Sequence, residues 1–136
     1  MSALARREHS RYELEQRFLS RAESEQSLAE VLDLLEQQGL LSDIRFAESL
    51  ARVRGARQGL RRIRYELAQK GVSETDAALA IDQLAKTEFK RLEDVWRKRF
   101  GVPPESLEQK ARQQRFLQQR GFAPEMIHRF LRGVTG

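Results

Sequence analysis

The sequence predicts an all-α protein of nine helices grouped as three units of three, and two observations support this prediction. First, residues 59–84 carry apolar residues at helical spacing on both sides of Gly71, the pattern of a helix, a turn and a second helix. Second, the pattern returns at a nearly constant offset: Leu67 is matched by Phe18, 49 positions earlier, and by Leu117, 50 positions later. A period of this length is typical of helical repeat proteins. We place the three repeats at residues 1–41, 42–85 and 86–136.

The first repeat is expected to contain a short amphipathic segment, a capped helix and an acidic helix. Residues 2–7 form the short segment. Ser10 begins the next helix, because Ser10 and Glu13 have the spacing of a capping box. The acidic helix runs over residues 25–38 and ends at Gly39; its apolar side consists of Leu28, Val31, Leu32 and Leu35. The turn before it has Ala22 where the other repeats have glycine, so we expect a wider turn there.

The second repeat is expected to begin with a helix that Ser42 or Asp43 caps. Residues 55–59 are expected to form a loop. The helix after the loop stops at Gly71, because glycine enters the left-handed conformation of a helix C-terminus without a Cβ penalty. A further helix begins near Ser73. The apolar residues of these helices are Phe46, Leu50 and Val53, then Leu60, Ile63 and Leu67, then Ala77, Ala80, Ile81 and Leu84.

The third repeat is expected to begin with a long helix over residues 86–100, in which Trp96 belongs to the core. Residues 101–104 break it, and Pro104 is placed in the first turn of the helix that ends at Gly121. Pro124 opens the last helix. The apolar residues are Phe89, Leu92, Val95, Trp96 and Phe100, then Leu107, Ala111 and Leu117, then Met126, Ile127, Phe130, Leu131 and Val134.

Composition excludes several classes of protein. The 136 residues are 40% hydrophobic, and no apolar run approaches the roughly 20 residues that a bilayer requires. No apolar segment near the N-terminus resembles a secretory signal. Without cysteine the chain forms no disulfide and no thiolate zinc site, which fits a reducing compartment. We therefore expect a soluble, cytoplasmic protein without a membrane partner.

No constellation of catalytic residues is found. The two histidines, His9 and His128, lie in different repeats, and neither has a carboxylate at a metal-binding spacing. A phosphate-binding glycine loop and a nucleophile elbow are both missing from the sequence. We therefore expect a protein that is not an enzyme and has no cofactor and no metal.

Charge is the most informative feature. The formal net charge is +5, but the signs are segregated: residues 23–51 carry −6, residues 52–70 carry +6 and residues 110–136 carry +5. A protein that only coats DNA would be basic more evenly. The blocks favour a binding surface that is positive in some places and negative in others.

The arginine-rich segment 52–70 is the strongest functional signal, because guanidinium groups suit carboxylate and phosphate partners. The alternative is a basic face that only keeps the protein soluble. The helix–turn–helix outline around Gly71 does not indicate a base-reading helix, since residues 73–84 contain no Lys or Arg. The residues predicted to bind are Arg45, Arg52, Arg54, Arg57, Arg61, Arg62, Arg64, Lys70, Arg120, Arg129 and Arg132.

Several segments resemble the RecX regulators of the bacterial recombinase RecA, in order and in spacing. They are LARREHSRYELEQRFL, VLDLLEQQGLLSDIRFAESLARVR, GLRRIRYELAQKGV and RQQRFLQQRGF, and together they extend over nearly the whole chain. The most specific parts are REHS followed by EL, and GLLSD-x-RFA-x-S followed by G-x-x-RI-x-x-EL. The resemblance implies three tandem three-helix repeats in an elongated, curved molecule.

The resemblance also implies a function. A RecX protein is expected to be a monomer that binds the RecA filament on single-stranded DNA, and single-stranded DNA itself only weakly. Binding inhibits ATP hydrolysis, strand exchange and repressor self-cleavage, which places the protein in DNA repair, recombination and the SOS response. Two alternatives remain: a single-stranded DNA-binding protein that competes for the strand, and a helical-repeat adaptor for another protein.

Overall fold

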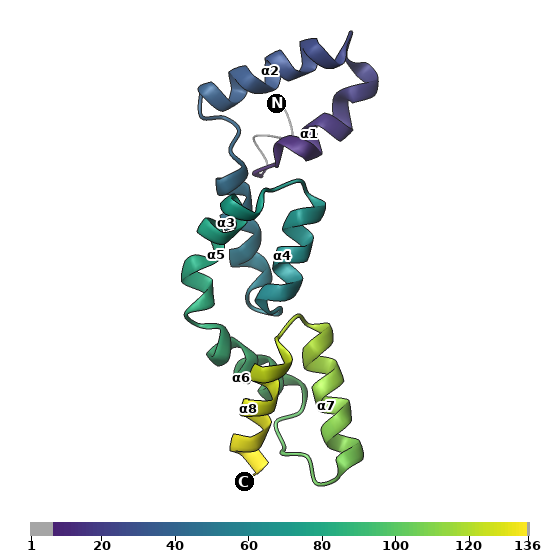
Figure 1. Ribbon diagram of the computed structural model, residues 1–136, viewed down its shortest axis with the longest axis vertical. Helices are drawn as coiled ribbons and strands as arrows, with labels where there is room; N and C mark the ends of the chain where they lie inside the picture. Colours follow the sequence, from purple (N-terminus) through teal and green to yellow (C-terminus); the bar gives the residue numbers. More distant parts are fainter. Residues whose placement is uncertain (1–6, 136) are drawn as a thin grey trace. The chain divides into compact units, whose positions relative to one another are not determined.

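A computed structural model describes residues 7–135 and confirms the all-α repeat fold (Figure 1). No strand occurs in these residues. The expected segment over residues 2–7 lies outside the described range except for Arg7, which is in a bend. The elements are α1 (Arg11–Phe18), the 3-10 helix η2 (Leu19–Arg21), α2 (Glu25–Gln37), α3 (Asp43–Arg54), α4 (Leu60–Gln69), α5 (Glu74–Ala85), α6 (Glu88–Arg99), α7 (Leu107–Gln119) and α8 (Pro124–Thr135).

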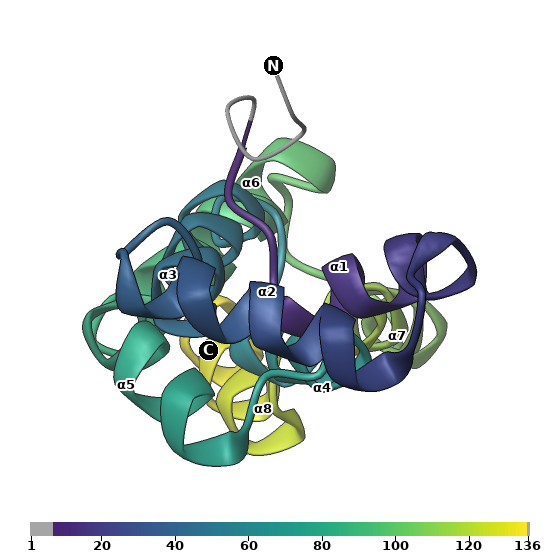
Figure 2. The ribbon, with the colours of Figure 1, turned by 90° about the horizontal axis from the view of Figure 1, so that it is seen from above.

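The described chain forms two compact units. Unit 1 contains residues 7–50 and 66–80, and unit 2 contains residues 51–65 and 81–135. In unit 1, α1 packs against α2 (Figure 1; Figure 2). The capping box is confirmed, because the Glu13 N–H donates to Ser10 Oγ (3.1 Å) and the Ser10 N–H donates to Glu13 Oε1 (3.1 Å). One buried cluster of unit 1 consists of Leu14, Leu32 and Leu41, with Phe18, Leu28 and Leu35 packed against it. Other buried apolar residues of this unit are Phe46, Ala47, Leu67, Val72 and Ala77.

The turn between α1 and α2 differs from the glycine turns. Gly39, Gly71 and Gly121 have positive φ angles of 75°, 76° and 96°, as expected for helix stops. Ala22 instead follows η2 in an extended conformation with φ −80°. Three residues of 3-10 helix therefore replace the left-handed turn, and no glycine is required at this position.

Two valines expected on apolar stripes are exposed. Val31 is 54% exposed, because it lies at the edge of the stripe that packs on α1, beside the exposed Leu34. Val53 of α3 is 62% exposed, because the buried face of that helix contains Ala47 and Ala51 and does not include Val53. Alanine allows neighbouring helices to approach closely, and a stripe chosen from large side chains misses it.

Unit 2 is built on α6, α7 and α8, which pack against one another. Trp96 is 6% exposed and its Nε1–H donates to Gln113 Oε1 (2.8 Å), so the prediction that it belongs to the core is confirmed. The buried cluster of these three helices consists of Leu92, Val95, Trp96, Leu117, Phe122, Ile127, Phe130 and Leu131; Phe100, Phe116, Met126 and Val134 pack against it. Ala51, Ile63 and Ile81 of unit 2 are also buried.

The start of α7 corrects one prediction. The helix begins at Leu107 rather than at Pro104, because Ser106 caps it by accepting the Gln109 N–H at 3.1 Å. Proline also disfavours the helical conformation of the residue before it. Leu107 was expected to be buried, but as the first residue of the helix it points into solvent and is 86% exposed. Pro124 does open α8, as predicted.

Candidate binding surface

The loop over residues 55–59, between α3 and α4, packs on the turn between α7 and α8. The Gly59 N–H donates to the Arg120 carbonyl (2.7 Å), and the Arg61 N–H donates to the Gly121 carbonyl (3.1 Å). A Cβ on Gly59 would lie 2.5 Å from the Gly121 oxygen, and a Cβ on Gly121 would lie 2.4 Å from Arg62 Cβ. The two segments therefore meet backbone to backbone, and this contact requires glycine on both sides.

Two side chains of α6 form hydrogen bonds with the same loop and with the start of α4. Arg91 donates from Nη1 to the Gly55 and Gln58 carbonyls, at 2.9 Å each, and from Nη2 to the Leu84 carbonyl at 3.0 Å. Glu88, only 8% exposed, accepts the Leu60 N–H at 2.9 Å and so satisfies a donor at the start of α4. Burial lowers the pKa of Arg91. These contacts fix the position from which the basic residues of the loop and of α4 project.

A hollow of about 350 Å³ lies where this loop meets α6 and α7. Phe116 lines it together with two arginines: the Arg120 guanidinium carbon lies 4.8 Å from the ring centroid and that of Arg99 lies 5.3 Å from it. Among the described residues no Asp or Glu lines it. We name it the Phe116 hollow, and its lining consists of Ala56, Arg57, Val95, Lys98, Arg99, Phe116 and Arg120.

A second hollow, of about 270 Å³, lies next to the first. Arg120 lines one hollow and Gly121 lines the other, so that consecutive residues separate them. The aromatic residue here is Tyr65, which is 66% exposed. No acidic side chain of the described chain lines this hollow either. We name it the Tyr65 hollow, and its lining consists of Arg61, Arg62, Tyr65, Gln118, Gln119, Gly121 and Phe122.

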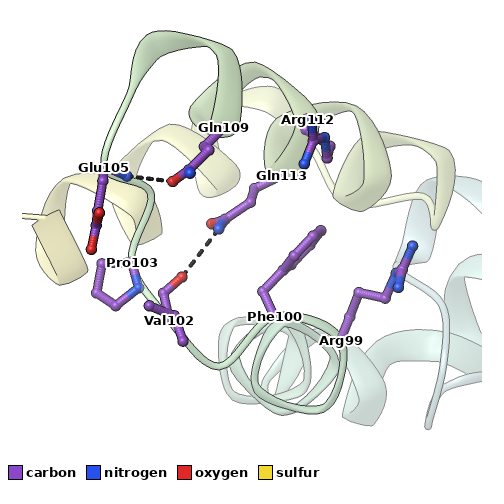
Figure 3. A pocket seen from close by; sticks show the side chains of 8 residues that line it. All are labelled: Arg99, Phe100, Val102, Pro103, Glu105, Gln109, Arg112 and Gln113. Carbon is purple, nitrogen blue, oxygen red and sulfur yellow. Dashed lines mark hydrogen bonds between the residues drawn. The ribbon is translucent and has the colours of Figure 1, made fainter.

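A third hollow, of about 360 Å³, lies between α7 and the loop before it (Figure 3). Its polar groups are largely engaged: Gln113 donates to the Val102 carbonyl (3.1 Å), and Gln109 accepts the Glu105 N–H (2.8 Å). Arg112 and Arg99 line it, but Glu105, on the opposite side from Arg99 in Figure 3, brings negative charge to the same hollow. This hollow is therefore a weaker candidate for an anion than the other two.

The structure brings together four of the eleven residues predicted to bind. Arg57 and Arg120 line the Phe116 hollow, and Arg61 and Arg62 line the Tyr65 hollow. Sequence reasoning missed Lys98, Arg99, Phe116 and Tyr65 as their neighbours. The basic last turn of α6 was visible in the sequence, but its proximity to residue 57 was not.

The other predicted residues lie elsewhere. In unit 1, Arg45 forms an ion pair with Glu8 (2.8 Å) and Lys70 forms one with Glu13 (3.3 Å). In unit 2, Arg129 stacks on Phe89 with its guanidinium carbon 4.5 Å from the ring centroid. The remaining four, which line none of the three hollows, are Arg52, Arg54, Arg64 and Arg132.

Metal clusters and membrane-spanning helices are two further features of interest in the described part of the chain. Residues 7–135 contain no group of three or more His, Cys, Asp or Glu side chains placed to hold a metal ion. They also contain no helix with the length and apolar character needed to cross a membrane. His128 is exposed on α8, whereas His9 is buried, with Nδ1 3.7 Å from Glu13 Oε1.

Comparison with known proteins gives consistent matches. The family model described as RecX, second three-helix domain, matches residues 42–81, and that of the third three-helix domain matches residues 76–131. A regulatory protein RecX of Leptothrix cholodnii is 41% identical over 129 residues, which are 95% of this chain and 82% of the relative. A regulatory protein RecX of Pseudomonas putida is 41% identical over 135 residues, 98% of this chain and 86% of the relative.

Two solved structures share the fold. The crystal structure of RecX from Lactobacillus salivarius has a TM-score of 0.77 at 21% identity, over 96% of this chain and 88% of that chain. A crystal structure of a regulatory protein RecX has a TM-score of 0.81 at 21% identity, over 96% of this chain and 67% of that chain. At this level of identity the likeness supports the fold alone.

Proposed function

The chain belongs to the RecX family of regulatory proteins, and on this premise we propose that it regulates homologous recombination and the SOS response. It binds the filament that RecA forms on single-stranded DNA and inhibits the ATPase, strand-exchange and coprotease activities of that filament. The observation that carries the proposal is the convergence of six cationic side chains on two adjoining hollows of unit 2, with no acidic lining residue in the described chain.

The mechanism follows from charge and from the repeat scaffold. The filament offers two anionic partners, the acidic side chains of the recombinase and the phosphates of the strand. The loop contacts with α6 and α7 fix the backbone positions from which Arg57, Arg61 and Arg62 project, so binding does not have to order the loop. A protein that bridges neighbouring subunits hinders the movements that hydrolysis and strand exchange require.

A second candidate function is competition for the strand itself. Tyr65 favours it, since an exposed aromatic side chain beside Arg61 and Arg62 is a feature of proteins that bind single-stranded nucleic acid. This candidate predicts affinity for bare DNA that falls steeply with salt and that equals or exceeds the affinity for the coated strand.

Charge reversal at the hollows tests the proposal. In the triple variant Arg57→Glu, Arg61→Glu and Arg62→Glu, we expect binding to RecA-coated single-stranded DNA to weaken by about tenfold or more, with a parallel loss of ATPase inhibition. The matched control reverses three cations that line none of the hollows, Lys86, Lys110 and Arg115, for the same change in net charge. Equal binding by the wild type and the hollow variant would contradict this placement.

A further inference from the structure

The two hollows of unit 2 have features that acidic protein side chains do not need and that a nucleic-acid strand does. The first is the way their cations are held. Arg99 and Arg120 lie over the Phe116 ring, and neither forms an ion pair within residues 7–135, so no carboxylate of the described chain neutralises them. Arg120 Nη1 donates to the Arg57 carbonyl (3.4 Å), and the other N–H groups of the two guanidinium groups suit phosphate oxygens.

The second feature is that backbone N–H groups occupy the carbonyls at the end of α7 and just beyond it. The last carbonyls of a helix form a partly negative end, which would repel a phosphate. The Phe116, Leu117 and Gln118 carbonyls accept N–H groups of the following turn, the Arg120 carbonyl accepts the Gly59 N–H, and the Gly121 carbonyl accepts the Arg61 N–H. These carbonyls are therefore already engaged beside the cations of both hollows.

The third feature is the chemistry of the Tyr65 hollow. Tyr65 is 66% exposed although its ring is large and mostly apolar, and Arg61, Arg62, Gln118 and Gln119 line the same hollow. A base stacks on such a ring, and the arginines contact the phosphates on either side. A carboxylate of a protein surface would use the arginines but not the ring.

The fourth feature is that the cationic sites repeat. Arg120 lines the Phe116 hollow and the next residue, Gly121, lines the Tyr65 hollow, so both hollows adjoin the turn after α7. A strand with one negative charge per nucleotide suits two cationic sites along its length. The cations that would contact it are Arg57, Lys98, Arg99 and Arg120 in the first and Arg61 and Arg62 in the second.

We propose that the Phe116 hollow binds backbone phosphates of single-stranded DNA and that Tyr65 stacks on a base of the same strand. This inference rests on the proposed function and assigns the strand, rather than the recombinase, as the ligand of the two hollows. The salt dependence of binding then reflects phosphate contacts at the Phe116 hollow, and tolerance of sequence reflects stacking at Tyr65.

The test uses the full chain, a fluorescently labelled oligo-dT and an abasic strand of the same length. In the double variant Arg57→Gln and Lys98→Gln, the slope of log affinity against log salt for bare oligo-dT should decrease in magnitude by about 1.4, for two lost phosphate contacts. Tyr65→Ala should weaken binding to oligo-dT about fivefold or more and leave binding to the abasic strand unchanged. Tyr65→Phe keeps the ring and should retain the wild-type affinity for both strands.

The control is Lys86→Gln, an exposed cation of unit 2 that lines none of the hollows. The same variants are measured on RecA-coated DNA, which separates the two proposals. If the hollow variants bind bare DNA as the wild type does but lose the coated strand, the hollows contact recombinase: this inference is wrong and the proposed function stands. In a further outcome, the variants show the expected changes on bare DNA, but the wild-type protein itself does not bind the RecA-coated strand. That outcome would support the inference and overturn the proposed function.

Discussion

Gly59 and Gly121 come from different repeats and meet so closely that a Cβ on Gly59 would lie 2.5 Å from the Gly121 carbonyl oxygen. This contact places the arginines of the second repeat beside those of the third. Arg61 and Arg62 follow Gly59 on α4, and Arg120 immediately precedes Gly121. The position of the candidate binding surface thus depends on two residues that have no side chain.

The glycine contact predicts the effect of adding one methyl group. Gly121→Ala places a Cβ at a φ of 96° and 2.4 Å from Arg62 Cβ, so we expect the free energy of unfolding to fall by about 2 kcal/mol or more in urea titrations. Gly133→Ala is the matched control. Gly133 lies in α8 with open space around it, and alanine there should raise the free energy of unfolding by about 0.5–1 kcal/mol. Equal effects of the two substitutions would contradict the close approach.

Arg91 is predicted to be a structural arginine, in contrast to the binding arginines. Arg91→Ala removes the guanidinium donor from the Gly55 and Gln58 carbonyls, while the Leu84 carbonyl keeps the Thr87 N–H and hydroxyl, and we expect a loss of about 3 kcal/mol in the free energy of unfolding.

The control for Arg91 is Arg97→Ala, because Arg97 is exposed and its ion pair with Glu93 (2.9 Å) is also exposed. This substitution should change the free energy of unfolding by less than about 1 kcal/mol. If Arg91→Ala were as mild as Arg97→Ala in thermal and urea unfolding, the role assigned to Arg91 in holding the loop would be refuted.

The lowered pKa of Glu13 is expected to make the stability of the fold depend on pH in the acid range. Burial opposes its ionisation, but hydrogen bonds from Arg7 and from the Ser10 N–H outweigh that effect and hold its pKa below the usual 4.5. A lowered pKa in the folded state stabilises the protein above the unfolded pKa, and this contribution is lost as the pH falls through the folded value. Glu13→Gln should therefore lose stability at neutral pH and vary less with pH below about 4.5.

The pKa of Asp43 is shifted in the opposite direction from that of Glu13, so Asp43 serves as the comparison. Its carboxylate accepts the Arg11 N–H at 2.8 Å, but burial raises its pKa above the usual 3.8, with Asp76 and Glu36 adding to the effect. Its ionisation therefore destabilises the fold as the pH rises. Asp43→Asn keeps a side-chain oxygen as acceptor and should remove this loss. Unfolding curves of both variants between pH 3 and pH 7 test the opposite signs, and slopes that change in the same direction would contradict this assignment.

Much of the fold is readable from local chemistry, and the exceptions share one cause. The Ser10 capping box and the glycines at 71 and 121 mark helix ends by interactions within a few residues, so they are predictable. The exposure of Val53 is not, because it depends on which neighbour covers α3. Helical periodicity identifies an apolar face but not how wide a strip of it the neighbouring helices bury.

The candidate site follows the same rule. The segment containing Arg57, Arg61 and Arg62 is conspicuous in the sequence because these residues lie close together along the chain. Lys98 and Phe116 are far from Arg57 in the sequence. They come close to it only in the folded chain, where all three residues line the Phe116 hollow. Arg91 is indistinguishable in the sequence from a solvent-exposed arginine, yet it is directed inward by backbone carbonyls of a loop more than 30 residues away.

The most direct test of the central proposal is the affinity of the purified protein for a labelled single strand, bare and coated with RecA and a bound nucleotide, in one buffer at physiological salt. The proposed function predicts binding to the coated strand that is tighter by at least about tenfold, since recombinase contacts add to those with the strand. Equal or tighter binding to the bare strand would contradict regulation through the filament and would identify DNA as the principal ligand.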